Sequence, residues 1–260
     1  MLTAITREVS ACVNDCERSF HERQPIDLAQ AVAQHKAYQS CLAELGVRVV
    51  SLPAEPELPD TVFVEDAAVI VDEVAVIWNM GAPSRRREAS SLANEISRFR
   101  PIAFLREPAT LDGGDVLRVG RHVFAGLSQR TNRQGIDQLR GLLRAFDYEV
   151  KPVDVRGGLH LKSACSYIGN DTILINRSWV DAEPFREYKL LDVPDEEPAA
   201  ANALLIKDVV IIPRSFPKTH ALLEGRGFCV QTIDVSELQK AEAGVTCGCL
   251  IFNLDVDVKS

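Results

Sequence analysis

Short apolar runs recur in pairs along this chain, and a tight polar turn separates the two runs of each pair. The runs are rich in β-branched residues, which is typical of β-hairpins. Four complete pairs cover residues 62–71 with 74–78, 116–119 with 122–125, 162–168 with 172–175, and 203–206 with 209–212. A further run at 247–252 begins a fifth hairpin near the C-terminus.

Helical patterns with one apolar face follow the hairpins. In residues 84–99, for example, Leu92, Ile96 and Phe99 fall on one face, and Ser84 is a candidate N-cap. The other helical patterns occupy residues 25–45, 131–146, 179–188 and 216–223. One more strand follows each helix, at residues 47–52, 102–105, 148–153, 190–193 and 228–233. The repeating unit is therefore β-β-α-β.

The two ends of the chain hold complementary parts of this unit. The hairpin at 247–252 has no helix after it, and the helix at 25–45 has no hairpin before it. Joining them completes a fifth unit and closes a ring without an open sheet edge. We therefore expect an α/β fold, a five-bladed pseudo-symmetric propeller closed by pairing of its N- and C-terminal segments, in a single domain over residues 1–260.

One polar residue stands at the start of each predicted hairpin. These residues lie roughly 40–50 positions apart, which is the spacing of blade-like repeats. They are Asp66, Asp112, His160, Asn202 and Cys247. Because equivalent positions in a closed ring face its axis, we expect these side chains to meet at the centre of the molecule. Asn202 is interpreted as structural.

Composition and charge narrow the functional classes. The net charge of −8 argues against a nucleic-acid partner and favours a cationic ligand. No apolar run reaches the roughly 20 residues of a membrane-spanning helix. The seven cysteines have no zinc-site spacing, and residues 1–7 lack the apolar core of a signal peptide. We expect a reduced, cytoplasmic protein without a metal, and the sequence leaves monomer and homodimer open.

Two of the residues at hairpin starts are suited to nucleophilic chemistry. Cys247 attacks as a thiolate and needs a nearby cation or base, whereas most free cysteines are small buried hydrophobes. His160 is the one of five histidines at a hairpin start, and it suits either proton transfer near neutral pH or a structural role.

Paired acids lie inside two apolar stretches, as Glu65-Asp66 and as Asp112 and Asp115 around two glycines. Burying a carboxylate is costly unless a cation pairs with it. The cation that pairs with these carboxylates is either an arginine of the chain or the guanidinium of a ligand. The two oxygens of a carboxylate match the geometry of a guanidinium.

The motifs around these residues are specific when taken together. In order along the chain they are Leu58-Pro59-Asp60, Phe63-Val64-Glu65-Asp66, Gly81-Ala82-Pro83-Ser84-Arg85-Arg86, Ala109-Thr110-Leu111-Asp112-Gly113-Gly114-Asp115-Val116-Leu117, Gly126-Leu127-Ser128-Gln129-Arg130-Thr131-Asn132, Gly158-Leu159-His160-Leu161-Lys162-Ser163 and Val245-Thr246-Cys247. From residue 58 onward the chain resembles the dimethylarginine dimethylaminohydrolase family of the guanidine-modifying (pentein, amidinotransferase-like) superfamily.

The resemblance implies a five-bladed α/β propeller and a role for each matching residue. Cys247 corresponds to the nucleophile, His160 to the acid–base group and Asp112 to its carboxylate partner. The residues that correspond to substrate-binding positions are Asp66 with Glu65 and Asp60 at the guanidinium, Arg85 and Arg130 at the α-carboxylate, Phe63 in the pocket wall, Glu242 where the family usually has an Asp near the α-amino group, and Val9 in the lid.

The same resemblance implies the reaction. Nω-methylated arginines would be hydrolysed to citrulline and methylamine or dimethylamine through a covalent cysteine thiouronium, without a metal or an organic cofactor. One alternative is an arginine deiminase or another guanidine hydrolase of the superfamily. Another is a non-catalytic binding module on the same propeller, which the presence of Cys247, His160 and Asp112 disfavours.

Overall fold

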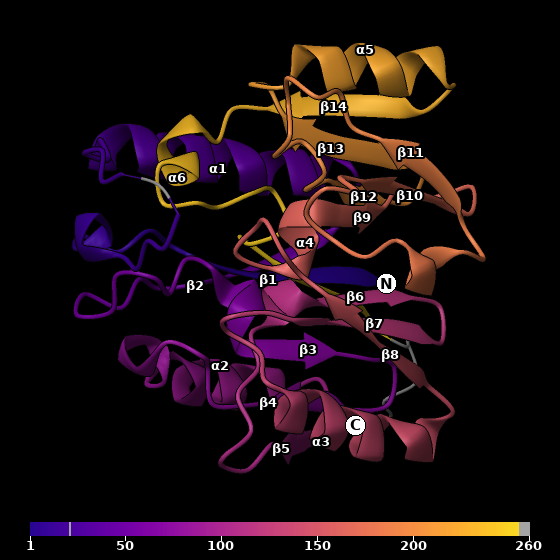
Figure 1. The fold of residues 1–260 in the computed structure, drawn as a ribbon. Coiled ribbons are helices and arrows are strands. Elements are labelled where there is room, and N and C mark those ends of the chain that lie inside the picture. The colour runs from indigo at the N-terminus through magenta and orange to yellow at the C-terminus, as the bar shows by residue number, and fades with distance from the viewer. Residues whose placement is uncertain (21, 255–260) are drawn as a thin grey trace.

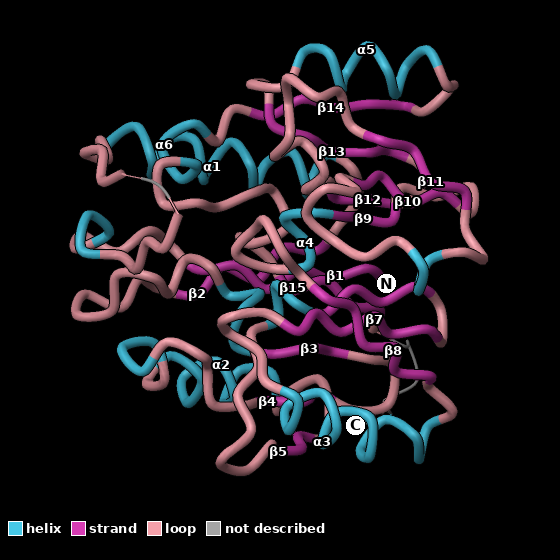
Figure 2. The backbone as a smooth tube through the Cα atoms, in the orientation of Figure 1, coloured by secondary structure: helices cyan, strands magenta, loops and turns pink. Residues whose placement is uncertain are grey.

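Five three-stranded sheets make up the computed structural model, which describes residues 1–20 and 22–254 (Figure 1). The strands lie towards the inside of the molecule, and the longer helices lie on its periphery (Figure 2). The five-fold repeat of the predicted α/β propeller is confirmed.

Each sheet follows the same rule, an antiparallel hairpin followed by a parallel strand. Along the chain the sheets are β3 (Ala68–Ile70), β4 (Ala75–Ile77) and β5 (Ile102–Phe104); β6 (Val116–Val119), β7 (His122–Leu127) and β8 (Glu149–Asp154); β9 (Cys165–Tyr167), β10 (Thr172–Ile175) and β11 (Lys189–Asp192); β12 (Leu204–Ile206), β13 (Val209–Pro213) and β14 (Cys229–Ile233); and β15 (Leu250–Asn253), β1 (Leu2–Arg7) and β2 (Arg48–Leu52).

Four helices connect the second and third strands of their units. They are α1 (Leu28–Glu44), α2 (Glu88–Ile96), α3 (Arg133–Leu143) and α5 (Pro217–Gly225). Asp27 caps α1 by accepting from the backbone N–H of Gln30, and Asn132 caps α3 by accepting from that of Gly135. The shorter α6 (Ser236–Gln239) lies beside α1 (Figures 1 and 2). Within the described residues, no helix combines the length and the apolar character needed to cross a membrane.

The fifth sheet joins the two ends of the chain. Leu2 of β1 lies opposite Asn253 of β15, and β1 runs parallel to β2 on its other side. Closure by the terminal segments is therefore confirmed. The sequence prediction nevertheless missed β1, which supplies the partner strand of β15 in place of a complete C-terminal hairpin. All of β1 after Leu2 is buried, so it shows no alternation of apolar and polar residues.

The polar residues at the predicted hairpin starts lie in turns rather than in strands. The strands predicted over 62–71 and 162–168 were wrong at their first residues, because the one-turn helices η2 (Val64–Ala67) and α4 (Leu161–Ala164) precede β3 and β9. The strand predicted over 247–252 begins only at Leu250, because residues 245–248 form a turn. A third one-turn helix, η4 (Gly113–Asp115), precedes β6. The reason is visible in the hydrogen bonds. The N–H of Gly114 points at Asp66 Oδ1 and that of Leu161 at Asp115 Oδ1, so neither is available to a sheet.

Two predicted helices are also shorter than expected. Residues 179–188 contain only the single turn η6 (Glu183–Phe185), because Val180 instead forms a bridge with Val155 of the neighbouring unit. Residues 84–99 divide into η3 (Pro83–Arg85) and α2, and Ser84 donates to Glu17 Oε1 at 2.5 Å rather than capping a helix. Both departures arise from contacts between distant segments.

Candidate active site

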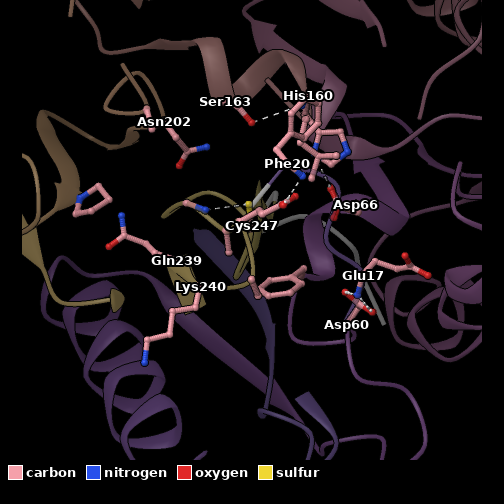
Figure 3. Close-up of a pocket in the computed structure, with 18 of the residues that line it drawn as sticks. Glu17, Phe20, Asp60, Asp66, His160, Ser163, Asn202, Gln239, Lys240 and Cys247 are labelled. Atoms are coloured by element: carbon pink, nitrogen blue, oxygen red, sulfur yellow. Dashed lines mark hydrogen bonds and ion pairs between the residues drawn. The ribbon is translucent and has the colours of Figure 1, made fainter. Parts of the chain in front are cut away.

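Four of the five polar residues at the unit starts line one cavity of about 740 Å³, and Cys247, His160, Asp66 and Asn202 point into it (Figure 3). The fifth, Asp112, lies behind His160 and is fully buried. The convergence expected from the repeat is therefore present in the structure.

Cys247 sits in a turn just before β15. The residue as a whole is partly exposed, and the backbone N–H of Gly244 points at its Sγ from 3.4 Å. Desolvation and the carboxylates of Glu65 and Asp66 raise the pKa of the Cys247 thiol, and the N–H of Gly244 opposes them only in part. The free protein therefore holds a neutral thiol, which requires a further positive charge to become a nucleophile.

His160 lies between two carboxylates. Its Nε2 is 3.2 Å from Asp112 Oδ2, and its Nδ1 is 3.9 Å from Asp66 Oδ1. Burial alone would lower the pKa of His160, but the charge of Asp66, the hydrogen bond with Asp112 and the charge of Asp115 outweigh burial and raise the pKa to about 9. His160 is consequently an imidazolium at neutral pH and is able to give up a proton.

The carboxylates behind His160 are fixed from several sides. Asp112 Oδ1 accepts from the N–H of Gly81 at 2.8 Å, which leaves Oδ2 for the imidazole. Asp115 accepts from the N–H of Leu161 and from the hydroxyls of Ser128 and Thr131. The second acid of the Asp-Gly-Gly-Asp motif thus holds the backbone that follows His160, a contribution that the sequence analysis did not assign.

Asp66 pairs with an arginine of the chain. Arg85 Nη1 donates to Asp66 Oδ2 at 2.6 Å. The Nε and Nη2 atoms of Arg85 donate to the two carboxylate oxygens of Glu88. Burial raises the pKa of Asp66, but the charges of His160 and Arg85 outweigh it and hold that pKa below its ordinary value. Glu88, which the sequence analysis missed, lies three residues after Arg85, a spacing typical of a helical ion pair.

Glu65 faces away from the cavity that holds Cys247. Its carboxylate pairs with Lys162 and accepts from the Thr246 hydroxyl at 2.8 Å, and it lines a second cavity of about 290 Å³. Burial raises the pKa of Glu65, although the charge of Lys162 partly offsets this effect. The structure therefore places Glu65 behind the Cys247 turn and apart from Asp60, Phe63 and Arg130, which do line the larger cavity.

A segment at residues 17–20, here called the strap, borders the larger cavity. Asp60 accepts from the N–H of Glu17, and Glu242 accepts from those of Ser19 and Phe20 at 2.9 and 2.6 Å. Arg130 Nη2 donates to the Ser19 hydroxyl. Val9, the position expected in the lid, instead packs in an apolar cluster and does not line the cavity.

The Glu242 carboxylate should hold the strap in place. We expect Glu242→Ala to speed hydrogen exchange at the Ser19 and Phe20 amides by about tenfold or more, because each amide loses its acceptor. Glu242→Gln, which keeps one acceptor oxygen, should have a smaller effect. The surface acid Glu183, paired with Arg186, is the matched control. Unchanged exchange in Glu242→Ala would show that the strap is held elsewhere.

Gly114 leaves room for the His160 ring. A Cβ at this position would lie 2.5 Å from His160 Nδ1, so Gly114→Ala should displace the imidazole and reduce turnover by about 100-fold. The control is Gly141→Ala in α3, where the new methyl group meets no described atom within 4 Å. That substitution should raise stability by roughly 0.5–1 kcal/mol, measured as Tm, without affecting turnover. Equal turnover in both variants would contradict this assignment.

Comparison with known proteins assigns the chain to a family. The family model described as N,N dimethylarginine dimethylhydrolase, eukaryotic, matches residues 3–242. The chain belongs to the dimethylarginine dimethylaminohydrolase family. The enzyme of that name from Pseudomonas aeruginosa is 32% identical over 250 residues, which cover 95% of this chain and 98% of the relative. The one from Streptomyces coelicolor is 36% identical over 227 residues, or 87% of each chain.

Solved structures agree with this family assignment. The P. aeruginosa dimethylarginine dimethylaminohydrolase, as a cysteine-to-serine mutant complexed with citrulline, superposes with a TM-score of 0.91 at 31% identity, covering 96% of this chain and 98% of that one. The N-terminal domain of the cyanobacterial arginine dihydrolase ArgZ superposes with a TM-score of 0.83 at 18% identity, which shows the shared fold alone. The family resemblance read from the sequence is confirmed.

Proposed function

We propose that this protein hydrolyses Nω-methylated arginines to citrulline and methylamine or dimethylamine, with residues 1–260 acting as one catalytic domain. The observation that carries the proposal is the placement of His160 between Asp66 and Asp112, in the wall of the cavity that Cys247 also lines. Figure 3 shows His160, Asp66 and Cys247 around this cavity. The family's P. aeruginosa member has been captured with citrulline, the product expected here.

The cavity offers complementary charges for both ends of an arginine derivative. Asp66 lines the cavity together with Cys247 and is the carboxylate that would face the guanidinium. Arg130 lines the same cavity. Its Nη1 is buried and has no hydrogen-bond partner among the described residues, so a substrate carboxylate would satisfy it. Glu242, which also lines the cavity, would lie near the α-amino group once the strap moves.

Arg85 has a different environment from Arg130. Its guanidinium is enclosed by Asp66, Glu88 and the Asp60 carbonyl oxygen. In our proposal Arg85 therefore acts on the substrate mainly by orienting Asp66, and Arg130 is the arginine that contacts the substrate carboxylate.

The first half-reaction breaks the bond to the methylated nitrogen. Binding of the cationic guanidinium favours loss of the Cys247 proton to solvent, and the thiolate attacks the central carbon. His160 gives its proton to the methylated nitrogen as the C–N bond breaks. The amine leaves, and a thiouronium remains on Cys247.

The second half-reaction uses the same two residues. His160, now neutral, takes a proton from a water molecule that attacks the thiouronium carbon. The C–S bond then breaks, the thiolate departs, the hydroxyl proton of the adduct is lost to solvent and citrulline is released. Asp112 keeps the imidazole oriented in both steps through its 3.2 Å contact with Nε2.

The decisive experiment separates the proposed reaction from its nearest alternative. The purified protein is incubated with asymmetric dimethylarginine or with arginine, and citrulline, dimethylamine and ammonia are quantified. We expect citrulline and dimethylamine in equal amounts from the first substrate and little product from the second. Citrulline and ammonia from arginine alone would identify an arginine deiminase instead. No product from either, with Cys247 unreactive towards a haloacetamidine, would favour a binding module.

A further inference from the structure

Asn202 occupies the fourth of the five equivalent positions, and the reaction above gives it no part. It precedes β12, is 7% exposed and borders the cavity in Figure 3. Both hydrogens of its Nδ2 are donated within the protein, to the carbonyl oxygen of Lys162 and to Thr246 Oγ1, each at 3.0 Å. Its Oδ1 accepts from the N–H of Thr246 at 3.2 Å.

These bonds join the two turns that carry the reacting side chains. Thr246 directly precedes Cys247, and Lys162 lies two residues after His160 in α4. The Thr246 hydroxyl continues the connection by donating to Glu65 Oε2. Since an amide offers two donor hydrogens, Asn202 has none left for a ligand.

Gly244 closes the other side of the same turn. A Cβ at Gly244 would lie 2.1 Å from Asn202 Oδ1, so the glycine allows the amide to fill the inside of the turn at 244–247. The N–H of Gly244 is the group that points at Cys247 Sγ. The Asn202 side chain therefore supports both the backbone beside the sulfur and the Gly244 N–H that points at it.

We propose that Asn202 is a positioning residue that fixes Cys247 Sγ relative to His160, and that it acts on bond formation at sulfur rather than on substrate binding. The proposal rests on the proposed function only in that Cys247 is the nucleophile. Its test can therefore use alkylation of that thiol by 2-chloroacetamidine, which does not depend on which guanidine the enzyme hydrolyses.

The test compares Asn202→Leu with a matched buried amide. Asn176 is 8% exposed, donates to Pro198 O and accepts from Ser178, away from the cavity. For alkylation of Cys247, followed on its peptide by mass spectrometry, we expect Asn202→Leu to lower kinact about 10- to 100-fold and to leave KI unchanged. Asn176→Leu should change neither, even if it lowers Tm. A raised KI with unchanged kinact, or no change in either, would overturn the proposal.

A second pair of variants keeps the test decisive if Asn202→Leu does not fold. Thr246→Val removes the hydroxyl that accepts from Asn202 while keeping the N–H, and Thr246→Ser retains the hydroxyl. We expect kinact to fall in the valine variant and to be largely restored in the serine variant. Equal kinact in the two would contradict the role of this bridge. If the unaltered protein turned over no methylarginine while these alkylation effects were still seen, the proposed function would fail and the positioning role of Asn202 would stand.

Discussion

Replacing Cys247 by serine reduces citrulline formation by about 10⁴-fold or more, and this is the largest effect that we expect from any single substitution. A serine hydroxyl loses its proton far less readily than a thiol, and His160, already protonated at neutral pH, cannot accept that proton. The substituted side chain is nearly isosteric and lies in a turn at the cavity, so the fold should be retained.

Cys249 is the matched control for this prediction. It lies two residues further on, is 3% exposed, and receives a hydrogen bond from the Tyr38 hydroxyl in an apolar cluster. Cys249→Ser should keep most of the turnover while lowering Tm, because a buried hydroxyl replaces a thiol. Citrulline formation and thermal unfolding, measured on both variants, check the pair. Substantial turnover in Cys247→Ser would remove Cys247 from the role of nucleophile.

The repeat explains why so much of the site could be predicted from the sequence. Turn residues and β-branched runs define the hairpins locally, and closure of five units then brings Asp66, His160 and Cys247 to one cavity. The motifs of the family supplied the chemistry that this geometry could not. The family motifs also predicted that Asp112 is the carboxylate partner of His160, and in the structure Asp112 Oδ2 lies 3.2 Å from His160 Nε2.

What the sequence could not supply depends on contacts between side chains far apart in the chain. Glu65 and Asp66 are adjacent acids in the same apolar stretch, so the sequence does not show which of the two side chains faces the cavity. The structure turns Glu65 away from it, towards Lys162 and Thr246. The bridge from Asn202 to Thr246 spans more than 40 residues, and no periodic pattern encodes it. Burial of β1 on both faces removed the alternation by which a strand is recognised.

Replacing His160 by glutamine should reduce turnover by about 10³-fold or more, the second large effect. Glutamine keeps a polar side chain of similar length, but its amide N–H is not acidic enough to protonate the departing amine, and general acid–base catalysis typically contributes about 10²–10⁴-fold. The loss should fall on kcat, because the cavity that binds the substrate is otherwise intact. Citrulline affinity measured by calorimetry on this variant should remain close to that of the unaltered protein.

The pH dependence distinguishes a proton donor at His160 from a purely structural imidazole. The carboxylates of Asp66, Asp112 and Asp115 outweigh burial and raise the pKa of His160 to about 9, so the imidazolium persists at neutral pH and is lost as the pH rises through that value. Turnover should therefore decline on the alkaline side near pH 9. Asp112→Asn removes one of the groups that raise this pKa, so the decline should begin at lower pH. If turnover of Asp112→Asn declined at the same alkaline pH as that of the unaltered protein, another group would limit turnover there. The proton of His160 would then not be required for catalysis.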